Sequence, residues 1–445
     1  EVVNQKNGEW THYKRKNQFE VSFDQLWLKL ESLGLVDEKH FQSILNTGMY
    51  KYCPDTMNVT QAQHEALTSI IHTIDSGETF PQIGHGFLAR PILIEGDAGT
   101  GKTVVATTLF YYLKTHPKYK SLKIGLVYSN PAMRNVIQQV FAHTPGLRKT
   151  DVIAPIDVTK HHYDIIICDE AQRLRQAKNI GRYIVHFKKG NERLHLDNSH
   201  DELDWLLLNA GRLILFYDPK QIVCPSDISQ TKFDGRLKDR KRGIRPVELK
   251  EQMRIHAGSQ YVPYIYDILF QRNNISKKFV NYDFKLFSSF QDMWNALEEK
   301  EAAVKLCRFC SGYGWPWVSK EDSKKPDIQL EGREIWWNRQ TDGWLQNPEA
   351  KLEMGSIYSL AGLDINYAAV IIGPDLIYDI KDQKIKVNRQ NYFDNKVKQG
   401  VTDEELTAFL LKTYAVLMTR GILGTYVYTC DQNLFRYLQR FIPTV

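Results

Sequence analysis

The feature that most constrains the fold is a glycine-rich stretch between an apolar run and a helical run. Residues Ile92–Thr107 have the sequence ILIEGDAGTGKTVVAT, so Gly-xxxx-Gly-Lys-Thr follows a predicted strand and opens a predicted helix. Glycines let backbone N–H groups surround phosphates, the helix start and the lysine add positive charge, and the threonine hydroxyl can bind Mg²⁺. The sequence therefore predicts a nucleotide site with Mg²⁺. Its residues are Gly96, Gly99, Gly101, Lys102 and Thr103.

A second apolar run, Asp164–Gln172 (DIIICDEAQ), contains two adjacent carboxylates at its end, Asp169 and Glu170. An isolated Asp-Glu pair is typical of a charged helix start. Because this pair follows a lysine loop at a short distance in the sequence, the catalytic interpretation is preferred. In that interpretation Asp169 holds the Mg²⁺ shell from the end of a neighbouring strand, and Glu170 polarises the attacking water.

One segment matches a guanine-recognition pattern. Thr231–Asp234 (TKFD) fits Asn/Thr-Lys-x-Asp, but the residues before it are polar, so no strand would deliver it to a base pocket. We therefore expect ATP rather than GTP.

Short, continuous apolar runs alternate with helical stretches along most of the chain. Runs of Val, Ile and Leu are typical of strands buried on both faces, and helices between them complete a βαβ rhythm. The sequence therefore predicts an α/β fold with parallel sheets, and 445 residues suit two to three domains. The expected strands are Pro91–Glu95, Lys123–Tyr128, Asp164–Cys168, Arg212–Tyr217, Ala368–Ile372 and Thr425–Tyr428, and the expected helices include Thr103–Lys114 and Ala132–Ala142.

Composition excludes several classes of protein. No apolar stretch approaches the roughly 18 residues that span a bilayer, and no basic-then-apolar leader opens the chain, so we expect a cytoplasmic protein without membrane contact. Six cysteines are too few for a disulfide scaffold. Cys307 and Cys310 lack a second ligand pair at zinc spacing and are interpreted as two thiols on a strand. The net charge of +6 permits a nucleic-acid partner without demonstrating one.

With the Asp-Glu-Ala-Gln box in place, the chain resembles superfamily 1 helicases from about Val59 to Arg440. Further motifs similar to those of the family occur in the family's order. They are VTQAQ at 59–63, LFYDPKQ at 215–221, LKEQMR at 249–254, SIYSLAGLDINYAAVII at 356–372 and YAVLMTRG at 414–421.

The resemblance implies roles for one residue in each motif. Gln63 is expected to contact adenine, and Gln221 to sense the γ-phosphate. Arg254 is expected to reach the phosphates, Arg420 to act as an arginine finger from a second domain, and Gly362 to permit a close turn. Either arginine alone would fit a helix-end or carboxylate-paired cation equally well.

The family's architecture implies two tandem RecA-like P-loop domains that sandwich ATP. We expect a short N-terminal accessory segment at 1–50, a first domain with the lysine loop and carboxylates at 51–240, and a second domain at 241–445. The basic stretch 236–245 is the expected boundary, although a solvated charged loop fits it as well. The second domain contains a tryptophan-rich, loop-like insertion at about 311–350.

More narrowly, Gly312–Trp317 (GYGWPW), the LFYDPKQ box and the Met-Thr-Arg-Gly ending resemble a bacterial branch related to the helicase-like domain of Schlafen proteins. Relatives there are often fused to other domains, and the chain begins with Glu1 rather than Met, so we expect a fused or separate effector. Two departures stand out. Asp364 replaces the family's glutamate, so whether this residue contacts ribose or nucleic acid stays open. The short spacing from Lys102 to Asp169 leaves no room for an accessory subdomain.

Single-stranded nucleic acid is expected to cross both domains. Ser129 and Asn130, after the second predicted strand, resemble the motif that contacts the strand's backbone, and small polar groups suit contact with phosphates. The alternative is an ordinary strand-to-helix turn with a Ser or Asn cap. The tryptophans of the insertion could stack on bases or fill the core.

Two functions follow from these patterns. The first is an ATP-hydrolysing helicase or translocase domain that acts on single-stranded DNA or RNA. The second is a nucleotide-gated interaction module of a larger, defence-related protein with little unwinding activity. The complete set of Lys102, Asp169, Glu170, Gln221, Arg254 and Arg420 favours the first.

Overall fold

The computed structural model of the protein describes residues 2–6, 9–13, 52–54, 59–76, 91–238, 247–272, 275–339, 344, 350, 353–360 and 363–445. The chain divides into two compact units, Glu1–Tyr50 and Lys51–Val445. In the first unit, strands β1 (Val2–Lys6) and β2 (Glu9–Tyr13) pair antiparallel. Gly362 and the domain boundary expected at 240 and 241 lie outside the described residues, so their assignments stay predictions.

The first sheet of the second unit contains the glycine-rich segment. Over the described residues it has six strands, all parallel, in the order β5-β4-β6-β7-β3-β8. These strands are β3 (Pro91–Gly96), β4 (Ile124–Tyr128), β5 (Val152–Ile153), β6 (Tyr163–Asp169), β7 (Ala210–Tyr217) and β8 (Val247–Leu249). Because β6, β7 and β3 are neighbours and parallel, the segments that follow their carboxyl ends meet at one edge of the sheet.

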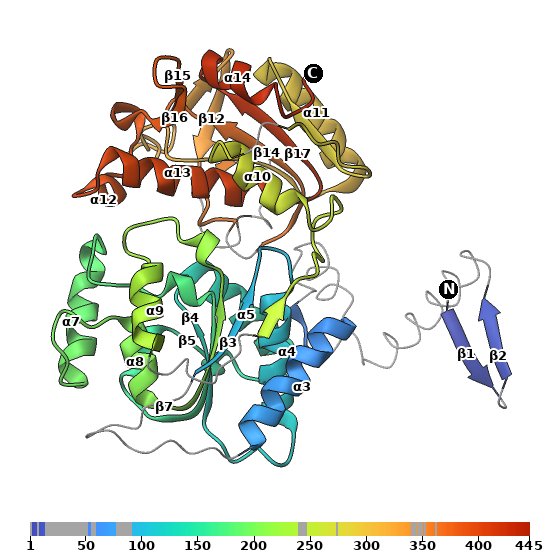
Figure 1. Cartoon of the computed structure of the whole chain (residues 1–445), viewed down its shortest axis with the longest axis vertical. Coiled ribbons are helices and arrows are strands. Elements are labelled where there is room, and N and C mark those ends of the chain that lie inside the picture. Colours follow the sequence, from blue (N-terminus) through green and yellow to red (C-terminus); the bar gives the residue numbers. More distant parts are fainter. Residues whose placement is uncertain are drawn as a thin grey trace. The chain divides into compact units, whose positions relative to one another are not determined.

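Helices cover both faces of the first sheet. They are α3 (Gln61–Asp75), α4 (Lys102–Thr115), α5 (Pro131–His143), α6 (Pro155–Val158), α7 (Ile184–Arg193), α8 (Glu202–Asn209) and α9 (Gln230–Lys238), with the turns η2 (Lys149–Asp151), η3 (Ala171–Arg173), η4 (Gly181–Tyr183) and η5 (Pro219–Gln221). Helices α4 and α5 lie on one side of the sheet, and α8 and α9 lie on the other (Figure 1). The TKFD segment is inside α9, so it does not follow a strand.

The second sheet follows in the chain. Over the described residues it has seven strands in the order β11-β12-β13-β10-β14-β17-β9, and only the β11–β12 pair is antiparallel. Its strands are β9 (Asp283–Leu286), β10 (Cys307–Ser311), β11 (Ile328–Leu330), β12 (Arg333–Trp337), β13 (Glu353–Gly355), β14 (Ile365–Ile372) and β17 (Gly421–Thr429). The other elements are α10 (Tyr261–Leu269), α11 (Phe290–Val304), the hairpin β15 (Leu376–Asp379) and β16 (Lys384–Val387), η7 (Arg389–Asn391), α12 (Asn395–Lys398), α13 (Asp403–Met418) and α14 (Gln432–Leu438).

Strand β14 shows how this sheet is buried on both faces. Ala368, Val370 and Ile372 pack in a core with α10, α13 and α14. The alternate residues, such as Ala369 and Ile371, pack with α11 in a second core. Since successive side chains of a strand point to opposite faces, a continuous apolar run fills both cores. The α/β fold with parallel sheets, its six expected strands and both expected helices are therefore confirmed.

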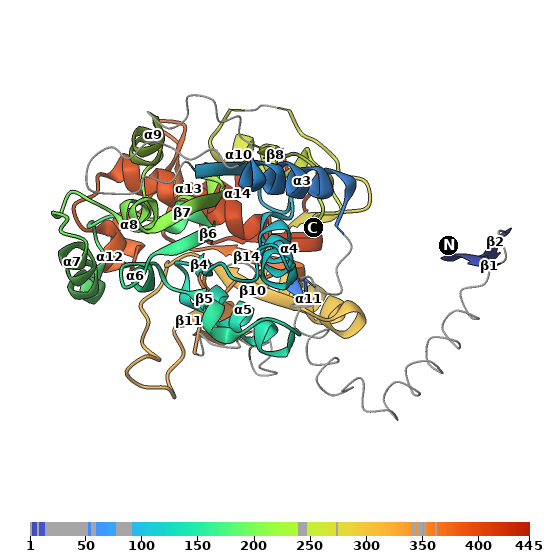
Figure 2. The same cartoon turned by 90° about the horizontal axis from the view of Figure 1, so that it is seen from below.

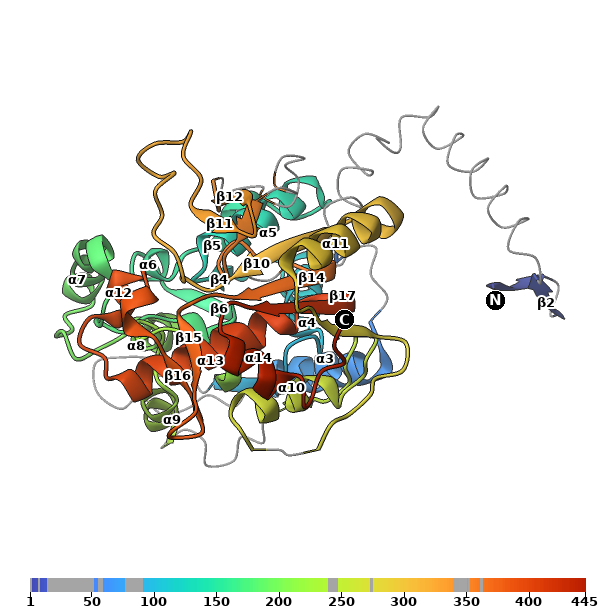
Figure 3. The same cartoon turned by 90° about the horizontal axis from the view of Figure 1, so that it is seen from above.

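The tryptophan-rich segment is more regular than its composition suggests. Residues 328–330 and 333–337 form β11 and β12, which extend the second sheet. Ile335 and Trp337 are buried in its core, and Trp336 between them is half-buried. Trp337 and Trp344 are buried, which fits the core-filling alternative for these two. The part between β10 and β11 extends away from the sheet as a long loop (Figures 2 and 3).

Among the described residues, none of the helices combines the length and the apolar character that a bilayer crossing needs. Cys307 and Cys310 lie on β10 as expected. Among all residues that the structure describes, no group of three or more His, Cys, Asp or Glu could hold a metal ion.

A buried carboxylate at the end of β14 predicts a pH-dependent stability. Asp375 is fully buried, accepts a hydrogen bond from the Tyr414 hydroxyl (2.7 Å), and burial raises its pKa to about 7. The folded state therefore retains a proton that the unfolded chain loses near pH 4, so stability falls as pH rises from about 4 to 7 and then levels. The full effect is on the order of 4 kcal/mol.

Asp375→Asn removes this titration. Urea unfolding at pH 5 and pH 8 should show a smaller loss of stability for the variant than for the parent. Equal losses in the two proteins would mean that Asp375 does not carry the pH dependence.

Candidate nucleotide site and nucleic-acid groove

The glycine loop, residues 96–103, joins β3 to α4 and has the backbone that glycine favours. Gly99 and Gly101 have φ of 87° and 85°, and Gly101 is the N-cap residue of α4. An added Cβ at Gly99 would overlap the Gln252 side chain, and one at Gly101 would overlap the Gln63 side chain. The loop is therefore enclosed on two sides by carboxamides, with the start of α4 behind it.

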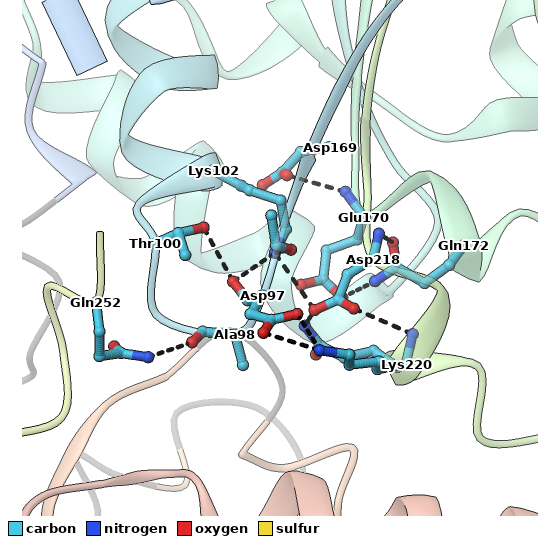
Figure 4. A network of polar contacts seen from close by, with 12 residues as sticks. Asp97, Ala98, Thr100, Lys102, Asp169, Glu170, Gln172, Asp218, Lys220 and Gln252 are labelled. Carbon is cyan, nitrogen blue, oxygen red and sulfur yellow. Dashed lines mark hydrogen bonds and ion pairs between the residues drawn. The ribbon is translucent and has the colours of Figure 1, made fainter. Parts of the chain in front are cut away.

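Lys102 is held inside this loop. Its ammonium donates to the carbonyl oxygens of Gly96 (2.7 Å) and Asp97 (3.0 Å) and lies 3.5 Å from Asp218 Oδ2 (Figure 4). The side chain is only 6% exposed, so an anion that entered the loop would meet a charge with little competing water. This geometry suits a phosphate group.

Asp169 ends β6 with one carboxylate oxygen that lacks a partner. Its Oδ1 accepts from the Glu170 N–H (2.9 Å), whereas Oδ2 has no hydrogen bond within the described part of the chain. Burial, and after it the Glu170 charge, raises the pKa of Asp169 to about 6, while the Thr103 hydroxyl and Lys102 act in the opposite direction. Thr103 and Asp169 are therefore close together, and a hydroxyl beside a buried, unpartnered carboxylate oxygen fits a hard cation such as Mg²⁺.

Glu170 is positioned by an unusual backbone conformation. Its φ of 54° and ψ of 44° are left-handed, which is uncommon for a residue other than glycine and occurs at functional sites. Its Oε2 accepts from Gln172 Nε2 (3.2 Å) and lies 3.8 Å from Arg173 Nε. The carboxylate is thus held by two neighbours on the turn η3.

A chain of polar contacts, the polar relay, runs from Glu170 to the second sheet. Gln172 accepts from the Asp218 N–H (3.1 Å), and Asp218 Oδ2 accepts from Gln221 Nε2 (2.8 Å). Gln221 Oε1 in turn lies 3.5 Å from Nη2 of Arg420, which precedes β17. Figure 4 shows the first members of this relay. The structure thus brings the predicted Gln221 and Arg420 together.

Arg420 and Arg254 lie close together. Arg420 is 3% exposed, and its Nε has no hydrogen-bond partner among the described residues. Burial, and then the Arg254 charge, lowers the pKa of Arg420, while the Glu170 and Asp364 charges oppose this. Arg254 Nε pairs with Asp364 Oδ1 at 2.6 Å. Asp364, which stands where the family has glutamate, therefore forms an ion pair with Arg254, one of the two predicted arginines.

Two residues flank the glycine loop, one predicted and one not. Gln63 Oε1 accepts from the Thr60 N–H (3.0 Å) and so caps α3, while its Nε2 faces Gly101; an adenine contact stays a prediction. Gln252 donates to the Ala98 carbonyl (2.8 Å), and its Oε1 accepts from the backbone N–H of Arg254 (3.0 Å). The sequence signal that could have identified Gln252 is its position in the LKEQMR motif, two residues before Arg254.

Tyr52 is a second residue that the sequence did not reveal. It is 2% exposed, and burial, followed by the Asp364 charge, raises its pKa. The Asp169 charge also raises this pKa, whereas the charges of Arg254 and Arg420 lower it. A tyrosine outside every motif therefore lies among charges from both sheets.

A cavity of about 1110 Å³, the groove, contains the predicted nucleic-acid residues Ser129 and Asn130. Asn130 also accepts from the Ala132 N–H (3.0 Å), so the helix-cap alternative holds for it as well. Segments of both halves of the second unit line the groove. Its cations are Arg173, Arg175, Arg182, Lys320 and Lys396, its aromatic residues are Tyr183, Tyr313, Trp315, Trp317, Trp337, Tyr358 and Phe393, and its carboxylates are Asp227 and Asp394.

Comparison of sequences shows what the chain is similar to. The family described as Schlafen group 3, DNA/RNA helicase domain, matches residues 90–431. The uncharacterized protein YPL245W of Saccharomyces cerevisiae is 27% identical over 393 residues, which cover 78% of this chain and 83% of that protein. The bacterial origin expected for the branch stays a prediction.

Solved structures give likenesses at low scores. The alignment with the arterivirus nonstructural protein 10 helicase covers 79% of this chain and 62% of that helicase, at 12% identity and a TM-score of 0.34. The Pif1 helicase of Candida albicans aligns with 84% of this chain and 95% of its own, at 10% identity and a TM-score of 0.33.

The glycine loop yields a matched pair of substitutions. Gly99→Ala adds a Cβ to a left-handed residue and also displaces Gln252, so we expect at least a tenfold loss of nucleotide affinity. Gly258→Ala has the same backbone cost, about 1 kcal/mol, because its φ is 79°, but its Cβ would meet nothing within 4 Å.

Titration with a fluorescent ATP analogue checks the difference. Gly258→Ala should keep the parental affinity. Equal affinities for both variants would mean that the steric environment of Gly99 does not shape the site.

Proposed function

Since the chain belongs to the Schlafen group 3 DNA/RNA helicase family, we propose that it is a nucleic-acid-dependent ATPase that translocates on, or remodels, single-stranded DNA or RNA. One observation carries the proposal: the polar relay joins Glu170 beside the lysine loop to Arg420 beside the second sheet. Phosphoryl transfer requires a positioned water and cationic groups that stabilise the charge on the transferring phosphoryl group, and this relay connects a residue suited to each role.

The first sheet supplies binding and water activation. Lys102 exchanges its carbonyl partners for oxygens of the β- and γ-phosphates, and Glu170 orients and polarises the attacking water. Thr103 and Asp169 would hold Mg²⁺, which neutralises charge on the phosphates when it is bound. The unpartnered Asp169 Oδ2 supports this assignment.

The second half of the chain supplies charge stabilisation. Gln221 lies between Asp218 and Arg420 and so links the γ-phosphate position to the arginine finger. Arg254 and Arg420 stabilise charge that develops on the transferring phosphoryl group, and the unpartnered Nε of Arg420 leaves a donor for it. Asp364 orients Arg254 by their ion pair.

The groove is the proposed path of the strand. Ser129, Asn130 and the arginines of the first half suit backbone phosphates, whereas aromatic side chains of the second half suit stacking on unpaired bases. Trp317, Tyr358 and Phe393 are 36–37% exposed, so ring surface is accessible there. The groove has five cations and two carboxylates. The pair of Asp227 with Arg173 (3.1 Å) removes one of each, so the cations remain in excess.

Strand separation is proposed to be weak. Between Lys102 and Asp169 the described chain contains only α4, β4, α5, η2, β5, α6 and β6, with no accessory subdomain. A domain of this kind fused to, or associated with, an effector would act as a motor or a nucleotide-gated switch rather than as a processive unwinding enzyme.

Two substitutions separate nucleotide binding from turnover. Lys102→Ala should weaken ATP binding and abolish turnover, because the charge inside the loop is lost. Glu170→Gln should bind ATP normally and lose hydrolysis, by at least a hundredfold in kcat, because the amide polarises water poorly. Calorimetric binding and a phosphate-release assay measure both; a Glu170→Gln protein that hydrolyses ATP at the parental rate would falsify the role of Glu170.

The strand itself should stimulate hydrolysis. Single-stranded oligonucleotides of DNA and RNA are added to a steady-state ATPase assay at low and high salt, beside a forked-duplex unwinding assay. We expect a higher kcat with strand, binding that weakens steeply with salt, and little unwinding. If neither nucleic acid binds or changes the rate, the interaction-module function takes the place of this proposal.

A further inference from the structure

We propose that Arg173 couples the groove to the catalytic carboxylate: it is the positioning residue through which a bound strand changes the state of Glu170. The inference rests on the proposed function and names the residue that regulates it. Arg173 follows the DEAQ box directly and lies on the turn η3 between the two sites.

Arg173 faces both sites at once. Its Nε lies 3.8 Å from Glu170 Oε2, and its side chain lines the groove although it is only 7% exposed. Its Nη1 donates to Asp227 Oδ2 at 3.1 Å. Burial alone would lower its pKa, but the Asp227 and Glu170 charges raise it, so the guanidinium stays charged and is shared between the two carboxylates.

Asp227 fixes the groove side of this arrangement. Its Oδ2 also accepts from the backbone N–H groups of Val223 (3.0 Å) and Cys224 (3.3 Å), in the segment that follows Gln221. A backbone hydrogen bond from the Ile228 N–H to the Leu174 carbonyl (2.7 Å) also joins the segments on either side of Arg173 and Asp227. Both catalytic segments, the one after β6 and the one after β7, therefore continue directly into one wall of the groove.

The contact with Glu170 is the weaker of the two that Arg173 makes. At 3.8 Å it is a loose ion pair, whereas the Asp227 contact has hydrogen-bond geometry. A strand phosphate in the groove adds a third anion that competes for the same guanidinium, and the loosest partner is released first. Glu170 Oε2 then keeps only the hydrogen bond from Gln172 Nε2, and its remaining lone pair can accept a hydrogen bond from the attacking water.

Arg175 offers a matched control two residues away. It lines the same groove, but its guanidinium lies over the Tyr183 ring (4.4 Å) and its backbone N–H donates to Glu202 (2.8 Å). Arg175 can therefore contribute to strand affinity without touching the catalytic carboxylate. The two arginines separate coupling from binding.

The experiment compares Arg173→Lys, Arg173→Gln and Arg175→Gln in the full chain. The lysine keeps the charge beside Asp227, so the fold is preserved, but it lacks the fork that spans two carboxylates. For each protein, kcat is measured without strand and with saturating single-stranded oligonucleotide, and the strand Kd is measured by fluorescence anisotropy. Melting temperatures check folding.

For the Arg173 variants we expect the ratio of stimulated to basal kcat to fall toward one even at saturating strand, while the strand Kd weakens no more than in Arg175→Gln. Arg173→Gln should also raise basal kcat, which a purely structural role would not do. Arg175→Gln should weaken the strand Kd severalfold and keep the parental ratio at saturation.

Two results would overturn the proposal. If the parent is stimulated and both folded Arg173 variants keep its full ratio, coupling runs elsewhere and only this inference fails. If the parent itself does not respond to any strand, the proposed function fails and the coupling role fails with it.

Discussion

The polar relay from Glu170 through Gln172, Asp218 and Gln221 is the interaction on which the rest of the site depends. Gln172 is fully buried and Asp218 is 1% exposed, so each unmade hydrogen bond there would cost a desolvated polar group. The relay is satisfied only when the segments after β6 and β7 are in register with each other. The sheet order β6-β7-β3 supplies that register, and the glycine loop lies beside it.

Local patterns in the sequence were enough to predict much of this architecture. Continuous apolar runs such as Asp164–Cys168 predicted parallel strands because a strand buried on both faces has no polar alternation, and β6 occupies Tyr163–Asp169. The lysine loop could be predicted for a related reason: its chemistry needs glycines, a lysine and a threonine within one continuous segment. Where the physical requirement is local, four of the six expected strands held to within two residues at each end. Strands β14 (Ile365–Ile372) and β17 (Gly421–Thr429) begin three and four residues earlier than expected.

What could not be predicted depends on contacts between distant segments. Asp364 and Arg254 pair across more than a hundred positions, and Gln252 encloses a loop that is more than a hundred and fifty positions away. Tyr52 belongs to no motif, and its environment arises only because groups from both sheets surround it. The regular strands β11 and β12 were missed because tryptophan-rich, polar sequence masks the alternation of Ile335 and Trp337.

The groove shows the functional consequence of the same folding constraint. Its first wall continues directly from the segments that hold Glu170 and Gln221, so that wall cannot shift without moving groups at the phosphates. In thermodynamic terms, two ligands that share a wall have a coupling free energy, and each must change the affinity of the other by the same factor. Under the proposed function, a strand that favours one placement of Arg173 would favour one state of the nucleotide site, and a bound nucleotide would change the affinity for the strand by the same factor. In a chain without an accessory subdomain between Lys102 and Asp169, this shared wall is therefore where we propose that hydrolysis and strand movement are linked.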